Sequence, residues 1–162
     1  IHDLALEMNV SAIGRTTIGS DLVDNNYTLD QISIAVSDAD YVINLLPLTV
    51  ETERIFSQNV FEHMKSSAFF INIGRGETVD EASLIIALQD GTIMGAGLDV
   101  FVDEPLTVDS PLWEMHNVIL SPHVAGLSKG YWDRQGDLFI HNLICYLEDD
   151  TALMHNIIDM SD

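Results

Sequence analysis

Cysteine, basic side chains and long apolar runs are all scarce in this sequence. Cys145 is the only cysteine, which excludes an internal disulfide framework and favours a reducing, cytoplasmic setting. Lysine and arginine together number 6 against 26 acidic residues, a formal net charge of -20, so the basic patch that nucleic-acid phosphates require is missing. No apolar run reaches the roughly 18 residues of a membrane-spanning helix. We therefore expect neither nucleic acid nor a membrane as a partner.

Apolar residues are plentiful by contrast. They make up 47% of the 162 residues, enough for the core of one ordinary domain. Cys145 is interpreted as a small apolar filler on a helix. No metal site is predicted, because the remaining histidines lack the spacing of metal ligands; these are His2, His63, His116, His141 and His155.

Apolar runs alternate with helical patterns along the chain. Strands are expected at 10–13, 41–47, 68–73, 92–100 and 117–120, and helices at 29–39, 50–56, 58–64, 81–91, 110–115 and 128–149. A helix end is expected just before the first strand, and the polar stretch 21–28 is expected to be a loop. Unbroken apolar strands between helices are typical of an α/β fold, with a parallel sheet covered by helices on both faces.

Three chemically useful side chains follow strands of this predicted sheet. Arg75, Glu104 and His123 come after successive apolar runs, and the carboxyl ends of parallel strands share one edge, where ligands bind. An arginine clamps a carboxylate, a histidine donates a proton to a ketone oxygen, and a glutamate favours the charged imidazole. This trio predicts a 2-keto acid site. Taken singly, each residue also has an ordinary structural explanation: a surface arginine, a turn glutamate and a loop histidine bonded to a carbonyl.

The stretch "LLPLTVETERIFSQNVFEHMKSSAFFINIGRGETVDEASLIIALQDGTIMGAGLDVFVDEPL", followed by "SPHVAG", resembles the nucleotide-binding domain of the D-isomer-specific 2-hydroxyacid dehydrogenases. The resemblance implies that Arg75 binds the substrate, that Glu104 pairs with the catalytic histidine and that His123 is the proton donor. The glutamate disfavours the formate dehydrogenase branch, which carries a glutamine there. The resemblance also implies a dinucleotide site formed by Leu46, Pro47, Thr49, Ile73, Gly74, Arg75, Asp99, His123, Ala125 and Gly126.

Two departures from the family pattern shape the remaining expectations. The G-x-G-x-x-G phosphate loop is absent, and "GAGLDV" leads into a strand instead of opening a helix. The chain therefore resembles a fragment of a Rossmann-like doubly wound fold without its first strand, its glycine-rich loop and most of its substrate domain. We expect a nucleotide-binding domain at 1–127 and a long helix and tail at 128–162 that returns to the substrate domain. Such a fragment is not expected to turn over alone.

The second departure concerns the cofactor. NAD-specific relatives carry an acidic residue at the end of the second strand, where this chain has Gly14, Arg15, Thr16 and Thr17. A guanidinium and hydroxyl groups suit a 2′-phosphate, so NADP is favoured over NAD.

The resemblance implies an oxidoreductase that moves hydride between NAD(P)H and a small 2-keto acid such as glyoxylate, hydroxypyruvate or pyruvate, acting as a homodimer. The alternative is a dinucleotide-sensing interaction module, because corepressors related to this family keep the fold and work by binding partners.

Overall fold

The computed structural model describes residues 8–16 and 20–158. The helix end expected before the first strand falls largely outside these residues, as does Thr17. The chain divides into two compact units, 1–124 and 125–162, and each is described by itself.

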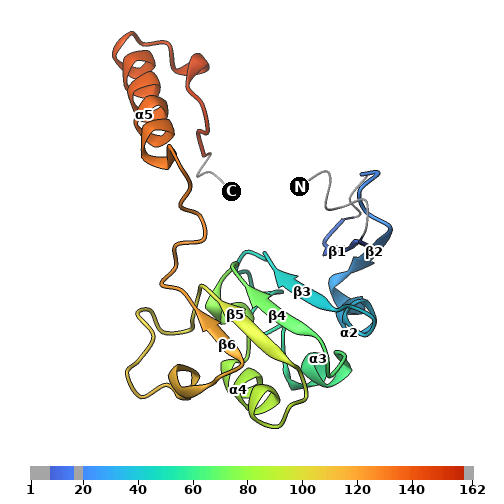
Figure 1. Cartoon of the computed structure of the whole chain (residues 1–162). Helices are drawn as coiled ribbons and strands as arrows, with labels where there is room; N and C mark the ends of the chain where they lie inside the picture. Colours follow the sequence, from blue (N-terminus) through green and yellow to red (C-terminus); the bar gives the residue numbers. More distant parts are fainter. Residues whose placement is uncertain (1–7, 17–19, 159–162) are drawn as a thin grey trace. The chain divides into compact units, whose positions relative to one another are not determined.

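The first unit is a parallel α/β structure (Figure 1). Every strand pair in it is parallel, and the strands form a pair, β1–β2, and a four-stranded sheet in the order β3-β4-β5-β6. The strands are β1 (Ser11–Gly14), β2 (Asn25–Thr28), β3 (Tyr41–Asn44), β4 (Phe69–Asn72), β5 (Gly95–Leu98) and β6 (Val118–Leu120). The expected Rossmann-like α/β class is confirmed.

From β2 onward, a helical segment lies between each strand and the next, as is usual for parallel connections. The helical segments are η1 (Leu29–Gln31), α2 (Ile32–Val36), α3 (Gln58–His63), η2 (Gly76–Thr78), α4 (Glu81–Gln89), η3 (Pro111–Glu114), α5 (Tyr131–Leu147) and η4 (Thr151–Leu153).

Two local predictions are wrong. The stretch 21–28 is not all loop, since Asn25–Thr28 forms β2 against β1. The helix expected at 50–56 is a turn, because the buried Thr52 hydroxyl bonds back to the Pro47 carbonyl at 2.6 Å and folds the chain on itself.

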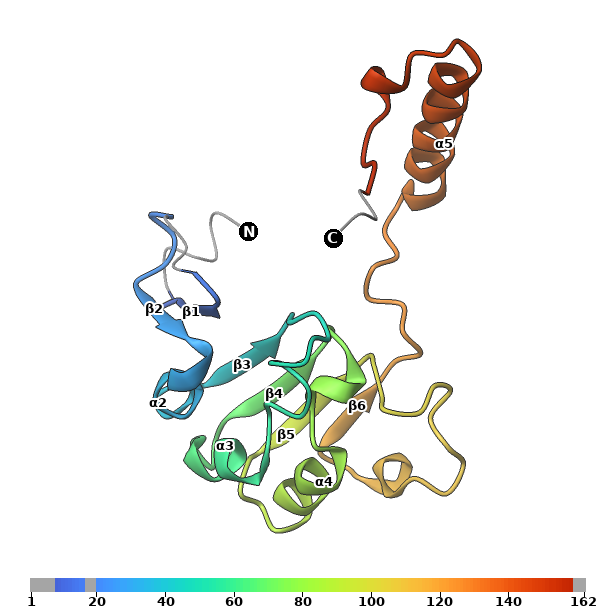
Figure 2. The same cartoon turned by 180° about the vertical axis from the view of Figure 1, so that it is seen from behind.

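The core lies between the four-stranded sheet and helices α2, α3 and α4. Figure 2 shows these helices and the sheet from the side opposite to Figure 1. Burial alternates along β3: Val42 is 7% exposed, whereas its neighbours Tyr41 and Ile43 are each 55% exposed. The expectation that this strand is buried on both faces is therefore wrong within the first unit. The reason is that side chains of all three helices join one buried cluster, on a single face of the sheet.

The second unit consists of α5, η4 and the chain that returns along the helix. Asn142 holds this return by two hydrogen bonds with the backbone of His155, both at 2.9 Å. Among residues 8–16 and 20–158, no helix combines the length and the apolar character that crossing a membrane requires.

At the carboxyl edge of the sheet, two glycines let three loops pack together. A Cβ added to Gly74 would come 2.8 Å from the Leu46 carbonyl oxygen, and one added to Gly76 would come 1.9 Å from the Phe101 carbonyl oxygen. Both obstacles are backbone, so a side chain fits at neither position. The glycines on either side of Arg75 thus allow the loop after β4 to lie against the loops after β3 and β5.

Gly76→Ala is expected to destabilise the first unit by about 3 kcal/mol, because the new methyl group forces the two loops apart. Urea unfolding followed by circular dichroism measures the change. Gly97→Ala, in the neighbouring strand β5, is the matched control: its Cβ would meet only the Ile71 side chain, at 3.9 Å, so stability should change by less than about 1 kcal/mol. Equal effects of the two substitutions would contradict this account of the loop packing.

Candidate functional site

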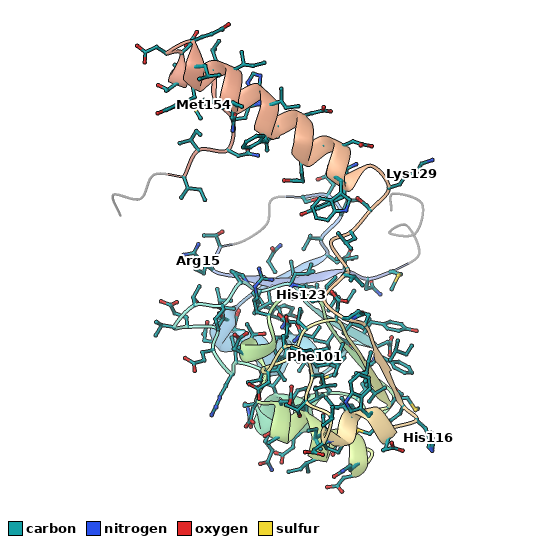
Figure 3. All side chains as sticks on the ribbon, turned by 90° about the vertical axis from the view of Figure 1, so that its left-hand side faces the viewer. Arg15, Phe101, His116, His123, Lys129 and Met154 are labelled. Atoms are coloured by element: carbon teal, nitrogen blue, oxygen red, sulfur yellow. The ribbon has the colours of Figure 1, made fainter. Side chains whose placement is uncertain are left out.

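The three predicted catalytic side chains converge at the carboxyl edge of the sheet. His123 Nδ1 lies 2.7 Å from Glu104 Oε2, although the two residues are 19 positions apart in the sequence. Arg75 lies near enough for its positive charge to contribute to the lowered pKa of Glu104. In Figure 3, His123 lies at the same end of the sheet as Arg15, and His116 lies at the opposite end.

Glu104 uses both of its carboxylate oxygens. Oε1 accepts the Phe101 backbone N–H at 3.0 Å, and Oε2 receives the His123 ring nitrogen. Because a carboxylate only accepts, the proton in the second contact belongs to Nδ1, which leaves Nε2 as the ring nitrogen available for chemistry. The side chain of Glu104 is 36% exposed and that of His123 is 47% exposed, so a small molecule can reach the pair.

The pKa of Glu104 is lower than its ordinary value. Partial burial acts to raise this pKa, but it is outweighed by the hydrogen bonds from His123 and from the Phe101 N–H, together with attraction to the charges of His123 and Arg75. Glu104 is therefore a carboxylate at neutral pH, and it accepts the hydrogen bond from the His123 ring.

His123 is held in an uncommon backbone conformation, with φ at +53°. Asp99 supports it: the Asp99 carbonyl accepts the His123 N–H at 2.8 Å, and its buried carboxylate accepts from the Val124 N–H at 2.9 Å and from the Ser121 hydroxyl. Strained backbone at a functional position persists only where its surroundings determine it. Asp99 therefore fixes the direction in which the imidazole leaves the chain.

Arg75 has an exposed side chain on a fixed backbone. Its Nη1 donates to the Gly74 carbonyl at 2.7 Å, and its own carbonyl accepts from Asn72 and from Thr78. The guanidinium is thereby attached to the loop after β4, with further N–H groups available to a ligand.

Two cavities open at this edge of the sheet. The first, of about 410 Å³, is lined by Leu45, Leu46, Pro47, Leu48, Ile73, Gly74 and Arg75. The second, of about 500 Å³, is lined by Phe101, Glu104, Pro105, Leu106, Trp113, Leu120, Ser121, Pro122 and His123. Five of the positions that the resemblance implies for the dinucleotide line the first cavity, and the hydrogen-bonded pair of Glu104 and His123 lines the second.

The positions expected near the ribose lie at the ends of β1 and β3. Arg15 and Thr16 are exposed directly after β1. A hydrogen bond from Thr49 is the largest cause of a lowered pKa at Glu51, and attraction to Arg15 is a further cause. Arg15 therefore lies within electrostatic reach of Glu51, which is in the turn after Thr49. Ala125 and Gly126 begin the second unit, and their roles stay predictions.

These residues fit part of a nicotinamide dinucleotide. The first cavity presents both polar and apolar surface. At Gly74 a Cβ would meet backbone, so two chain segments approach each other closely there. Arg15 supplies a cation where a ribose phosphate is expected. Within residues 8–16 and 20–158, no glycine-rich phosphate loop is found, and no group of histidine, cysteine or acidic side chains has the arrangement of a metal site.

Sequence reasoning missed the buried polar side chains beneath these loops, namely Asn44, Asn72 and Thr78. A signal was present, since β3 and β4 read "YVIN" and "FFIN" and both end on asparagine. A buried polar side chain at the last position of each of two strands indicates that it forms hydrogen bonds at the strand end.

Comparison with known proteins agrees with this arrangement. The family described as "D-isomer specific 2-hydroxyacid dehydrogenase, NAD binding domain" matches residues 3–125. Glyoxylate/hydroxypyruvate reductase B of Salmonella newport is 57% identical over 89 residues, which are 55% of this chain and 28% of that protein. The chain thus matches less than a third of the length of this curated relative.

Solved structures show the same fold. A D-isomer specific 2-hydroxyacid dehydrogenase from Xanthobacter autotrophicus, in complex with NADPH and MES, is 33% identical with a TM-score of 0.82, over 98% of this chain and 64% of that one. An NADPH-dependent glyoxylate/hydroxypyruvate reductase from Sinorhizobium meliloti, in complex with NADP and sulfate, is 30% identical with a TM-score of 0.80, over 96% and 49%.

The family match covers most of the chain, and the likeness in structure extends over nearly all of it. The chain belongs to the D-isomer specific 2-hydroxyacid dehydrogenase family.

Proposed function

We propose that the protein containing this chain reduces small 2-keto acids to D-2-hydroxy acids with NADPH. The observation that carries the proposal is the contact between His123 and Glu104, beside Arg75, at the edge of the sheet where ligands bind. Glyoxylate, hydroxypyruvate and pyruvate are the proposed substrates. The name of the Salmonella relative supports the first two.

The proposed chemistry divides among three side chains. A bound nicotinamide dinucleotide supplies a hydride to the ketone carbon, and the C=O electron pair moves to oxygen. His123 Nε2 donates the proton that this oxygen takes up, and Glu104 stabilises the imidazolium before the transfer. Arg75 holds the substrate carboxylate by paired N–H bonds and so fixes the distance between the ketone and the imidazole.

The proposed dinucleotide site uses the first cavity and the loops around it. Leu46, Pro47, Ile73 and Gly74 would line the nicotinamide side, and Thr49, Arg15 and Thr16 the ribose side. Asp99, His123, Ala125 and Gly126 would complete the nicotinamide end. The two solved relatives are complexes with NADPH and with NADP, which supports NADP over NAD.

We further propose a cytoplasmic homodimer, with a nucleotide-binding domain at 1–127 and a helix and tail at 128–162 that contacts a substrate domain. The lone Cys145 supports the reducing compartment.

The direct test is oxidation of NADPH by the whole protein with glyoxylate, hydroxypyruvate and pyruvate in turn. Steady turnover of at least one of the three is expected. Binding of NADPH with no turnover across a wider panel of 2-keto acids would contradict the proposal and would favour the partner-binding alternative.

Arg75→Met is expected to lower kcat/KM for the 2-keto acid by about 1000-fold, because a charge-assisted pair with the substrate carboxylate is lost. The dissociation constant of NADPH, measured by fluorescence, should change by a much smaller factor, because the other positions that line the first cavity are unaltered. Arg54→Met is the matched control: it removes the same charge from an exposed arginine and should leave kcat/KM within about twofold of the wild type. Similar losses in both variants would point to net charge and not to a carboxylate clamp.

Glu104→Gln is expected to lower kcat by about 10- to 100-fold, because the neutral amide replaces a charge-assisted hydrogen bond to His123 Nδ1 and holds the ring less firmly. Steady-state kinetics with the 2-keto acid checks this. The lowered pKa of Glu104 also stabilises the fold above the pKa of an unfolded glutamate, and this gain is lost as pH falls through the folded value. Wild type and variant should therefore converge in stability in acid. An unchanged kcat in the variant would exclude the proposed role of Glu104.

Arg15→Asp is expected to shift the ratio of kcat/KM for NADPH over NADH by about 100-fold towards NADH, because an attraction to the 2′-phosphate becomes a repulsion. Arg15→Ala should give a smaller shift in the same direction. Steady-state kinetics with both dinucleotides at a fixed 2-keto acid concentration measures the ratio. An unchanged ratio in both variants would show that Arg15 does not contact the ribose end.

A further inference from the structure

Three polar side chains lie fully buried beneath the proposed site, and the chemistry above uses none of them. Asn44 is 1% exposed, Asn72 is 2% exposed and Thr78 is 0% exposed. They stand at the ends of β3 and β4 and in η2, surrounded by the apolar core. Burying amides and a hydroxyl costs free energy unless each finds partners, so their contacts indicate what they hold.

Asn44 joins the other two and the loop after β3. Its Nδ2 donates to Asn72 Oδ1 at 2.9 Å and to Thr78 Oγ1 at 2.7 Å, while its Oδ1 accepts the Leu46 N–H at 3.0 Å. Both amide protons and the carbonyl oxygen of this side chain are therefore engaged. Asn44 therefore links the loop after β3, which lines the first cavity, to both Asn72 and Thr78.

The side chains of Asn72 and Thr78 both bond to the backbone of the loop that carries Arg75. The Arg75 carbonyl accepts the Thr78 hydroxyl at 2.6 Å and Asn72 Nδ2 at 3.2 Å, and Asn72 Oδ1 accepts the Gly74 N–H at 3.1 Å. The chain is thus held on both sides of the Arg75 Cα atom. Since the guanidinium also bonds to the Gly74 carbonyl, its position follows from the position of this loop.

Resting on the function proposed above, we propose that Thr78 is a positioning residue for substrate binding: with Asn44 and Asn72 it fixes the Arg75 guanidinium relative to the Leu46 loop. Thr78 itself touches neither substrate nor dinucleotide. Its hydroxyl accepts from Asn44 and donates to the Arg75 carbonyl, so it is one of two side chains, with Asn72, that bond Asn44 to this carbonyl.

The test compares Thr78→Val, which keeps the shape and removes the hydroxyl, with Thr78→Ser, which keeps the hydroxyl. In the whole enzyme, Thr78→Val should raise KM for the 2-keto acid about tenfold, because a misplaced guanidinium binds the carboxylate less well. Thr78→Ser should restore the wild-type KM. Should Thr78→Val not fold, Thr78→Cys takes its place, since a thiol is a weak donor of similar size.

Asn117→Ala is the matched control. Asn117 Nδ2 also donates to two backbone carbonyls, those of Leu88 at 3.2 Å and Met94 at 3.3 Å, but it lies before β6, at the opposite end of that strand from His123. This variant should lose stability without changing KM for the 2-keto acid. An unchanged KM in Thr78→Val, or an equal rise in the control, would overturn the proposal.

Hydrogen exchange separates this proposal from the proposed function, because it needs no turnover. In Thr78→Val, amide exchange should accelerate in the segments 45–49 and 73–78, which contain the Leu46 and Gly74 N–H groups that the network holds. Asn117→Ala should leave both segments protected. Protection that is unchanged in Thr78→Val would overturn the positioning role even if the enzyme reduces 2-keto acids; accelerated exchange would support it even if the substrate proves different.

Discussion

The site depends on a buried hydrogen bond between two side-chain amides on neighbouring strands. Asn44 and Asn72 occupy paired positions at the ends of β3 and β4 and join through their side chains at 2.9 Å. Parallel strands bring their carboxyl ends to one edge, but they do not by themselves fix the loops that leave it. The asparagine pair provides that fixation, since its remaining polar atoms bond to backbone groups of the two loops.

A second constraint operates one strand further along. Glu104 accepts the Phe101 N–H with one oxygen and meets His123 with the other, so the carboxylate connects the loop after β5 to the loop after β6. Asp99 holds the His123 backbone in its uncommon conformation. Each of the three proposed catalytic groups is therefore fixed by backbone contacts, and each comes from a different strand end. Preorganisation of this kind limits the cost of ordering the groups when a ligand binds.

The sequence permitted prediction of the α/β class and of the positions of the proposed site residues at strand ends, because apolar runs and polar strand ends leave a direct trace. The strand Asn25–Thr28 was not predictable from apolarity: it reads "NNYT", and Tyr27 alone among its side chains is partly buried. The turn after Thr49 reads as a helix start until the contact between Thr52 and Pro47 is seen. The catalytic roles themselves still rest on resemblance and geometry.

The central claim is that these loops place a guanidinium and an imidazole on one small ligand. A crystal structure of the whole enzyme with NADPH and oxamate, a non-reducible mimic of pyruvate, tests it most directly. The account predicts the oxamate carboxylate on the Arg75 guanidinium and its adjacent carbonyl oxygen within hydrogen-bond distance of His123 Nε2. Oxamate bound away from either residue, or Arg75 and His123 turned to separate ligands, would contradict it.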